Sequence, residues 1–158
     1  MKLSIRAGFN FGLTSGIITT VGLMVGLYSS TNSQLVVIGG IITISLADAL
    51  SDSMGMHVAV ESQNRHSKKE IWEATYATFI YKFIFSALFI IPVLFFNLHK
   101  AVLISILISL YLIFANSLFL ARQQNISPIK VIIEHVILTI IVIIASYFVG
   151  AGISIICA

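Results

Sequence analysis

The chain is poor in charge and in cysteine, and each shortage excludes a class of protein. Only 9% of its 158 residues are charged, against about 25% in a typical soluble domain, while 58% are hydrophobic. An apolar excess of this size in a chain of one domain length indicates an integral membrane protein. The single cysteine, Cys157, allows neither a disulfide framework nor a CxxC zinc site.

The sequence also lacks the motifs of catalysis and of nucleotide binding. It has no nucleophile paired with a base, no phosphate-binding loop and no cofactor motif, so we predict no enzyme activity and no cofactor. The formal net charge of +3 comes from basic residues that lie mostly in loops. Basic loops of a membrane protein face anionic lipid, and we therefore predict a bilayer partner and no nucleic acid.

Five long apolar segments dominate the chain. Each comes near the ~20 residues that a helix needs to cross a bilayer, so we predict an all-α polytopic membrane protein with five transmembrane helices in a single domain. The first segment is longer than the ~7–15-residue apolar core of a signal peptide, and we expect it to be retained. The expected helices are Gly8–Tyr28, Gln34–Val60, Ala74–Phe96, Ala101–Leu120 and Val131–Ile153, within the domain 1–158.

Lysine and arginine are distributed unevenly between the two ends of these helices. Most of them precede the first helix or lie in the second and fourth connections, whereas only Lys100 falls in a connection on the other side. Under the positive-inside rule this asymmetry predicts a cytoplasmic N-terminus and an external C-terminus, in a cell membrane or an organelle membrane. The residues on the cytoplasmic side are Lys2, Arg6, Arg65, Lys68, Lys69, Arg122 and Lys130.

The first helix is rich in small residues at helical spacing. Gly12 and Gly16 form one GxxxG motif, and Gly22 and Gly26 form another. Small residues let helix backbones approach closely in lipid. Two interpretations stay open, namely packing against the second helix of the same chain and dimerisation of two chains.

The second helix carries charge where a membrane helix should not. Asp48 and Asp52 lie one turn apart on one face, and a carboxylate inside the hydrocarbon layer costs at least ~2.5 kcal/mol on insertion scales. Such residues usually mark an ion or proton path, and this spacing lets two carboxylates reach one cation. Lys82, at a similar estimated depth, allows the alternative of a buried ion pair in which Lys82 and Asp52 merely neutralise each other.

Further candidate ligands lie near this pair. Ser15 is at a similar estimated depth on the first helix, and Met56 lies at the edge of the carboxylate face. Other polar residues lie nearer the cytoplasmic helix ends, where they form the mouth of a path. Mixed oxygen, imidazole and thioether donors favour Fe²⁺ or Mn²⁺. We therefore predict a metal site drawn from Asp48, Asp52, Met56, Ser15, His57, Glu61 and Glu134.

Two stretches of the sequence resemble a known family, the vacuolar iron transporters. The first helix of the family is similar to FGLTSGIITTVGLMVGL, and its second helix is similar to ADALSDSMGMHVAVESQ; together they cover roughly the first 65 residues of the chain. The resemblance implies five helices and a homodimer whose two-fold axis lies near the first two of them. It also implies that Fe²⁺ or Mn²⁺ leaves the cytosol in exchange for protons.

The chain departs from the family pattern at several positions of these two helices. Ser15 stands where the family has an aspartate, and Asp52 stands where it has a methionine. Met56 replaces a glutamate of the family and His57 replaces a tyrosine. The acid is thus absent from the first helix and present at the same estimated depth on the second. The connection 61–73 also lacks the long, glutamate-rich cytoplasmic insert with which iron-transporting members collect metal.

We interpret the chain as a divergent, short member of this family. The expected function is export of iron or manganese, Fe²⁺ or Mn²⁺, from the cytoplasm by proton antiport through a path at a homodimer interface. One alternative is a transporter of another cation, such as Ca²⁺, that uses the same carboxylates. The other is a non-transporting membrane subunit with a structural Asp–Lys pair.

Overall fold

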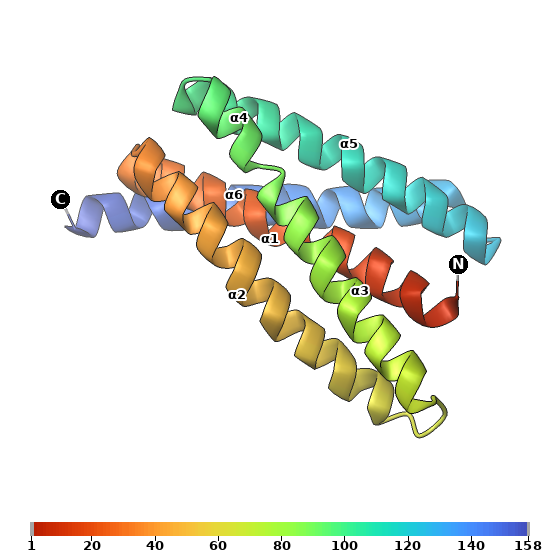
Figure 1. The fold of residues 1–158 in the computed structure, drawn as a ribbon. Helices are drawn as coiled ribbons and strands as arrows, with labels where there is room; N and C mark the ends of the chain where they lie inside the picture. Colours follow the sequence, from red (N-terminus) through yellow and green to blue (C-terminus); the bar gives the residue numbers. More distant parts are fainter. Residues whose placement is uncertain (1, 158) are drawn as a thin grey trace.

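The computed structural model describes residues 2–157, which form six α-helices and no β-strand. Five helical spans among them are long and apolar enough to cross a membrane. The predicted all-α architecture with five transmembrane helices is therefore confirmed (Figure 1). The helices are α1 Leu3–Thr31, α2 Gln34–Glu61, α3 Lys68–Ala87, α4 Ile90–Phe95, α5 Leu98–Gln124 and α6 Pro128–Cys157.

Capping residues explain why several helices begin where they do. α3 begins before the predicted boundary because the Ser67 side chain accepts a hydrogen bond from the Glu70 backbone, while the Glu70 carboxylate accepts one from the Ser67 backbone. This capping box satisfies two N–H groups that a helix start otherwise leaves free. The Asn97 side chain caps α5 by accepting a hydrogen bond from the Lys100 backbone N–H. Pro128 opens α6, since proline has no N–H to leave unpaired in a first turn.

The third transmembrane span is broken, whereas the sequence predicts one continuous helix over Ala74–Phe96. α3 ends at Ala87, and α4 begins at Ile90 after a turn at Leu88 and Phe89. The cause is Pro92, which has no N–H to donate to the carbonyl of Leu88 and whose ring crowds that carbonyl. The Gln34 side chain donates a hydrogen bond of 2.6 Å to the Val93 carbonyl and ties α4 to the start of α2.

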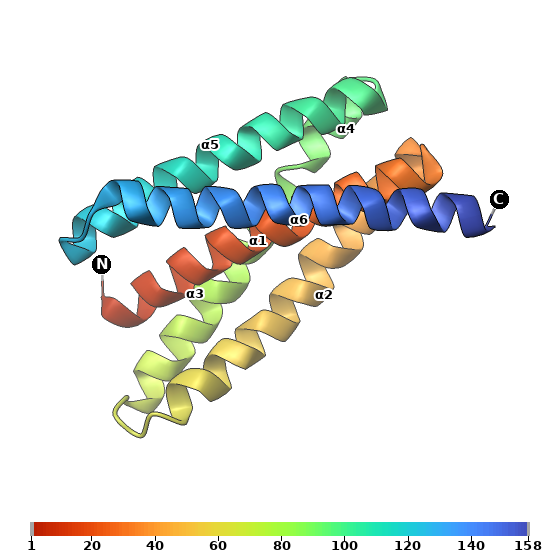
Figure 2. The same cartoon turned by 180° about the vertical axis from the view of Figure 1, so that it is seen from behind.

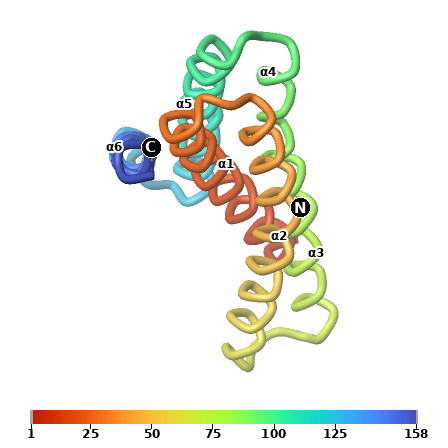
Figure 3. The backbone as a smooth tube through the Cα atoms, turned by 90° about the vertical axis from the view of Figure 1, so that its left-hand side faces the viewer, coloured from red at the N-terminus to blue at the C-terminus, as the bar shows by residue number. Residues whose placement is uncertain are grey.

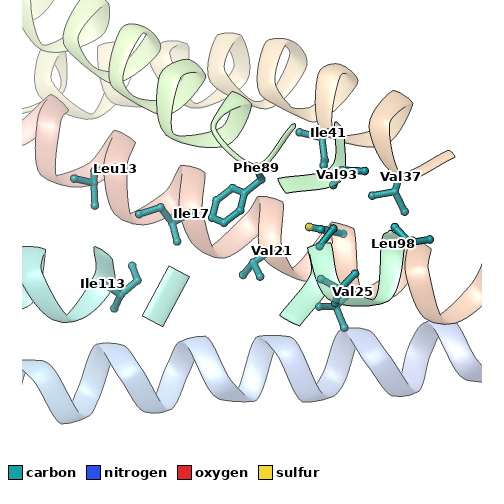
Figure 4. Packing of buried hydrophobic residues seen from close by; sticks show 13 residues of the cluster. Leu13, Ile17, Val21, Val25, Val37, Ile41, Phe89, Val93, Leu98 and Ile113 are labelled. Atoms are coloured by element: carbon teal, nitrogen blue, oxygen red, sulfur yellow. The ribbon is translucent and has the colours of Figure 1, made fainter. Parts of the chain in front are cut away.

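α1 lies at the centre of the fold and contacts all four other long helices. Figure 3 shows it between α6 on one side and the α2–α3 pair on the other. The main hydrophobic core forms around its buried apolar residues and reaches α2, α4 and α5 (Figure 4). The labelled core residues are Leu13, Ile17, Val21, Val25, Val37, Ile41, Phe89, Val93, Leu98 and Ile113.

The two GxxxG motifs of α1 pack against α3 and α6 of the same chain, so neither motif packs against the second helix, which was one of the two open interpretations. A Cβ atom at Gly12 would lie 2.8 Å from the Thr78 carbonyl oxygen of α3. A Cβ atom at Gly22 would lie 2.8 Å from the Val142 side chain of α6. The absence of side chains at these glycines is what lets α3 and α6 approach the α1 backbone so closely.

The basic connections gather at one end of the helix bundle. In Figure 1 the N-terminus, the α2–α3 connection and the α5–α6 connection all lie on the right, and the C-terminus lies on the left. Figure 2 shows the same segregation from behind. The helix directions therefore agree with the separation of charge on which the predicted orientation depends.

The close contact between α1 and α3 predicts a specific sensitivity at Gly12. Replacing Gly12 by alanine places a Cβ against backbone atoms of Thr78 and Lys82, which cannot move aside as a flexible side chain can. We expect Gly12→Ala to lower the free energy of unfolding by about 1–3 kcal/mol through overpacking. Thermal unfolding in detergent micelles measures the effect.

Gly152→Ala is the matched control, because a Cβ at this helical position meets no atom within 4 Å. We expect it to be neutral or stabilising by up to about 1 kcal/mol, as alanine is the better helix former. Equal melting temperatures for the two variants would contradict the close approach of α1 and α3.

Candidate metal-binding site

α2 presents two carboxylates toward α1 and α3 in the middle of the bundle. Asp48 and Asp52 are separated by one helical turn and so point from the same side of α2. Their side chains are 27% and 26% exposed, and they are therefore neither sealed in the core nor free at the surface. This partial burial lets protein groups hold one side of the pair while the other side stays accessible.

Lys82 of α3 binds both carboxylates at once. Its Nζ lies 2.6 Å from Oδ2 of Asp48 and forms a second ion pair with Oδ2 of Asp52. It also donates a hydrogen bond of 2.9 Å to the Ser15 hydroxyl. The ammonium thus donates hydrogen bonds to Ser15 and Asp52 and forms ion pairs with both acids. Lys82 is completely buried, so these ion pairs and hydrogen bonds replace contacts with water that the charge has lost.

α1 completes the site with two hydroxyl groups. Ser15 donates a hydrogen bond of 2.9 Å to Oδ2 of Asp52. The Thr19 hydroxyl lies 3.1 Å from Oδ2 of Asp48 and 2.8 Å from the Ser15 carbonyl oxygen, between which it shares its hydrogen. Ser15 and Thr19 are one turn apart, matching the spacing of the two acids on α2. Three helices thus converge on one cluster, which we call the carboxylate centre: Ser15, Thr19, Asp48, Asp52 and Lys82.

The remaining carboxylate oxygens are the open part of the centre. The ion pairs and hydrogen bonds described above all engage Oδ2; within residues 2–157, no hydrogen bond reaches the Oδ1 atom of Asp48 or Asp52. Asp48 also lines a groove of about 670 Å³ between α1 and α2, together with Leu23, Leu27 and Gly40. Among these lining residues Asp48 is the charged one, and Lys82 is not one of them.

A second polar cluster lies at the basic end of α2 and α3. His57 and Glu61 line a cavity of about 210 Å³ together with Lys68 and Trp72. The Nδ1 atom of His57 lies 3.0 Å from the Thr75 hydroxyl oxygen. That hydroxyl donates its own hydrogen to the Ile71 carbonyl, so it can only accept from the ring. The hydrogen-bond pattern therefore puts the proton of a neutral His57 on Nδ1 and leaves Nε2 free to bind a metal ion.

The other two predicted ligands lie apart from the carboxylate centre. Met56 packs against a small apolar cluster that includes Val60 and Ile71. Glu134 is exposed on α6, a helix that packs against α1 and α5. In the described part of the chain, no group of three or more His, Cys, Asp or Glu residues is arranged to hold a metal ion. The seven predicted residues thus occupy several places, with Ser15, Asp48 and Asp52 together at one of them.

Two members of the carboxylate centre were not predicted in full from the sequence. The sequence pattern assigns Thr19 to the small-residue stripe of the first helix, although its spacing from Ser15 equals the spacing of the two acids. It pairs Lys82 with Asp52 alone and does not indicate the contact with Asp48. A lysine in an apolar span close in depth to two acids is the signal that would have suggested a shared contact.

Comparison with known protein families shows where this site belongs. The model of the VIT family matches residues 8–74, which include most of α1, all of α2 and the start of α3. Over these residues the chain is similar to the VIT family. Members of the VIT family transport ions across membranes and are not enzymes. The match contains Ser15, Thr19, Asp48 and Asp52, whereas Lys82 lies beyond it. No curated protein and no solved structure matches the chain.

The shared contact predicts that Lys82 stabilises the fold only while both acids are charged. Lys82→Met leaves two carboxylates facing each other without a cation, so we expect a loss of about 2–4 kcal/mol in the free energy of unfolding. The triple variant Lys82→Met, Asp48→Asn, Asp52→Asn removes the uncompensated charge. It should therefore regain most of the lost free energy of unfolding. Thermal unfolding in metal-free detergent buffer measures both, and unchanged stability of Lys82→Met would refute the ion pairs.

Proposed function

We propose that this protein exports a divalent metal ion, Fe²⁺ or Mn²⁺, from the cytoplasm in exchange for protons, along a path at a homodimer interface. The observation that carries the proposal is the carboxylate centre, in which two acids of an apolar helix stay about one quarter exposed and one of them, Asp48, lines a groove. Ionisable groups in such a helix are costly and usually mark an ion path.

The donor set of the centre favours one of the two metals. Carboxylate and hydroxyl oxygens are hard ligands, which suit Mn²⁺ and also Ca²⁺. Met56 packs elsewhere, so no thioether supports binding of softer Fe²⁺ at this position. Within the proposal, manganese is therefore the preferred cargo, and calcium is the competitor that a transport assay has to include.

The proposed path starts at the basic end of the molecule. The cavity lined by His57 and Glu61 offers an imidazole nitrogen and a carboxylate to an incoming ion. Asp52 lies nine residues before Glu61 on the same helix, which corresponds to about 14 Å along the helix axis. An ion that moves along α2 would pass from this mouth to the carboxylate centre.

The proposed homodimer would cover the most exposed apolar face of the bundle. Only 22% of the most hydrophobic part of α2 is buried within the chain. Leu46, Leu50 and Met54 are 51%, 51% and 54% exposed on this helix. A two-fold axis beside α2 would bring two carboxylate centres close together, so that two acids of each chain would serve one shared path.

Proton exchange follows from the chemistry of the same oxygens. A carboxylate binds a metal ion in its deprotonated form, so metal and proton compete for Asp48 and Asp52. A centre that meets the metal on one side of the membrane and protons on the other can therefore couple the two movements.

The ion pairs also favour a second candidate function, a non-transporting membrane subunit. In that case Lys82 and the two acids form an inert structural unit. Because Lys82 contacts both acids, replacing only Lys82 and Asp52 would leave the charge of Asp48 without an ion-pair partner. The decisive variant replaces all three, and a functional triple variant would favour this second candidate.

Transport into proteoliposomes tests the main proposal. We expect Asp52→Asn to reduce Mn²⁺ flux at least tenfold and the wild-type flux to depend on an imposed pH gradient. Ser53→Ala is the control on the same helix, because its hydroxyl donates to the Leu50 carbonyl and lies outside the carboxylate centre. Equal flux in Asp52→Asn and wild type at equal reconstitution would exclude the path, and a preference for Ca²⁺ would replace the proposed cargo.

Cysteine cross-linking tests the homodimer. In a Cys157→Ser background, we expect Leu46→Cys or Leu50→Cys on α2 to form covalent dimers in native membranes on mild oxidation. Leu107→Cys on α5 is the matched control, since Leu107 is also exposed, at 68%. Cross-linking of Leu107→Cys alone would move the interface away from α2.

A further inference from the structure

We propose that Lys82 is a tethered counter-ion that sets how tightly the carboxylate centre holds its metal, so that the bound ion can leave. This inference rests on the proposed metal site and assigns a role to a residue that lies beyond the family match. Lys82 would not contact the metal. Its positive charge would act on the metal ion through space, with the carboxylates lying between the ammonium and the metal.

The geometry separates the lysine from the side on which a metal arrives. The side chain of Lys82 is 1% exposed, whereas those of Asp48 and Asp52 are 27% and 26% exposed. The ammonium engages Oδ2 of each acid, and the two Oδ1 atoms receive no hydrogen bond from residues 2–157. A metal ion can therefore bind the open oxygens while the ammonium keeps its place.

Lys82 has no other carboxylate to which it could move. The remaining acids of the chain are Glu61, Glu70 and Glu73 near the ends of α2 and α3, and Glu134 on the exposed side of α6. Its ammonium already forms ion pairs with Asp48 and Asp52 and donates hydrogen bonds to Asp52 and Ser15. A fully buried ammonium that left these acceptors would face apolar surroundings without a partner, which is strongly unfavourable. Lys82 is therefore a fixed charge.

The consequence for metal binding is one of charge balance. Two carboxylates alone carry a charge of −2 and would be neutralised by a divalent ion. With Lys82 in place the centre carries −1, so a bound divalent ion leaves a charge of +1 in a region of low dielectric. Repulsion between the ammonium and the metal is strong there and weakens binding. A transporter needs such limited affinity, because an ion held too tightly cannot be released.

Titration calorimetry of the purified protein with Mn²⁺ tests the role of Lys82. We expect Lys82→Met to bind Mn²⁺ at least tenfold more tightly than wild type and to release it more slowly in transport. Lys100→Met is the matched control, because it removes the same charge in the first turn of α5, at the opposite end of the bundle from the basic loops. Mn²⁺ affinity equal to or weaker than that of wild type in Lys82→Met would overturn the inference.

A second variant and a second measurement keep the test decisive if Lys82→Met folds poorly. Lys82→Gln removes the charge but can still donate hydrogen bonds to the acids, and we expect the same increase in affinity. Mn²⁺ should also raise the melting temperature of Lys82→Gln more than that of wild type. A smaller or equal Mn²⁺-dependent shift would again overturn the role of Lys82.

Failure of the inference differs from failure of the proposed function. If wild type binds Mn²⁺ and Asp52→Asn does not, the proposed metal site is supported independently of the role of Lys82. If neither wild type nor the Lys82 variants bind Mn²⁺, the proposed site itself is excluded, and the role of Lys82 is excluded with it.

Discussion

The structure depends on one interaction, the contact of a buried lysine of α3 with two acids of α2. Charges in the interior of a membrane protein are tolerated only when they are paired and hydrogen-bonded, and each charge of this centre meets that condition. Lys82 fixes α3 against α2, and Ser15 and Thr19 fix α1 against both. The same network that holds three helices together also leaves both carboxylates about one quarter exposed, with Asp48 lining a groove. The atoms that hold the helices together are therefore the same atoms to which we assign the proposed function.

The five spans and their order could be predicted from the sequence, because hydropathy and loop charge are local properties. The break in the third span has a visible cause in Pro92, but proline also occurs in membrane helices that stay continuous, so its presence alone does not fix a boundary. The partners of the glycine motifs could not be predicted. Gly12 faces α3 and Gly22 faces α6 because of how distant segments pack, and no local pattern records that packing.

In the candidate site, too, contacts between distant segments could not be predicted from the sequence. Asp48 and Asp52 could be found from their place in an apolar helix, and their spacing showed that they share a face. Lys82 lies 30 residues beyond Asp52, so its contact with both acids depends on the hairpin of α2 and α3. Thr19 illustrates a different difficulty, since a threonine on a small-residue stripe serves packing and hydrogen bonding equally well. The sequence indicates which residues are unusual, and the fold shows which of them meet.

The position of α1 has a mechanical consequence for any change of shape. Half of its most hydrophobic part is buried, against 22% for α2 and 11% for α6. Its glycines hold two neighbours at backbone contact, and sliding along either would drive side chains into carbonyl groups. α1 is therefore the helix that is most tightly held by its neighbours. In the proposed transport, a rearrangement of helices would therefore involve the less buried α2 and α6 more than α1.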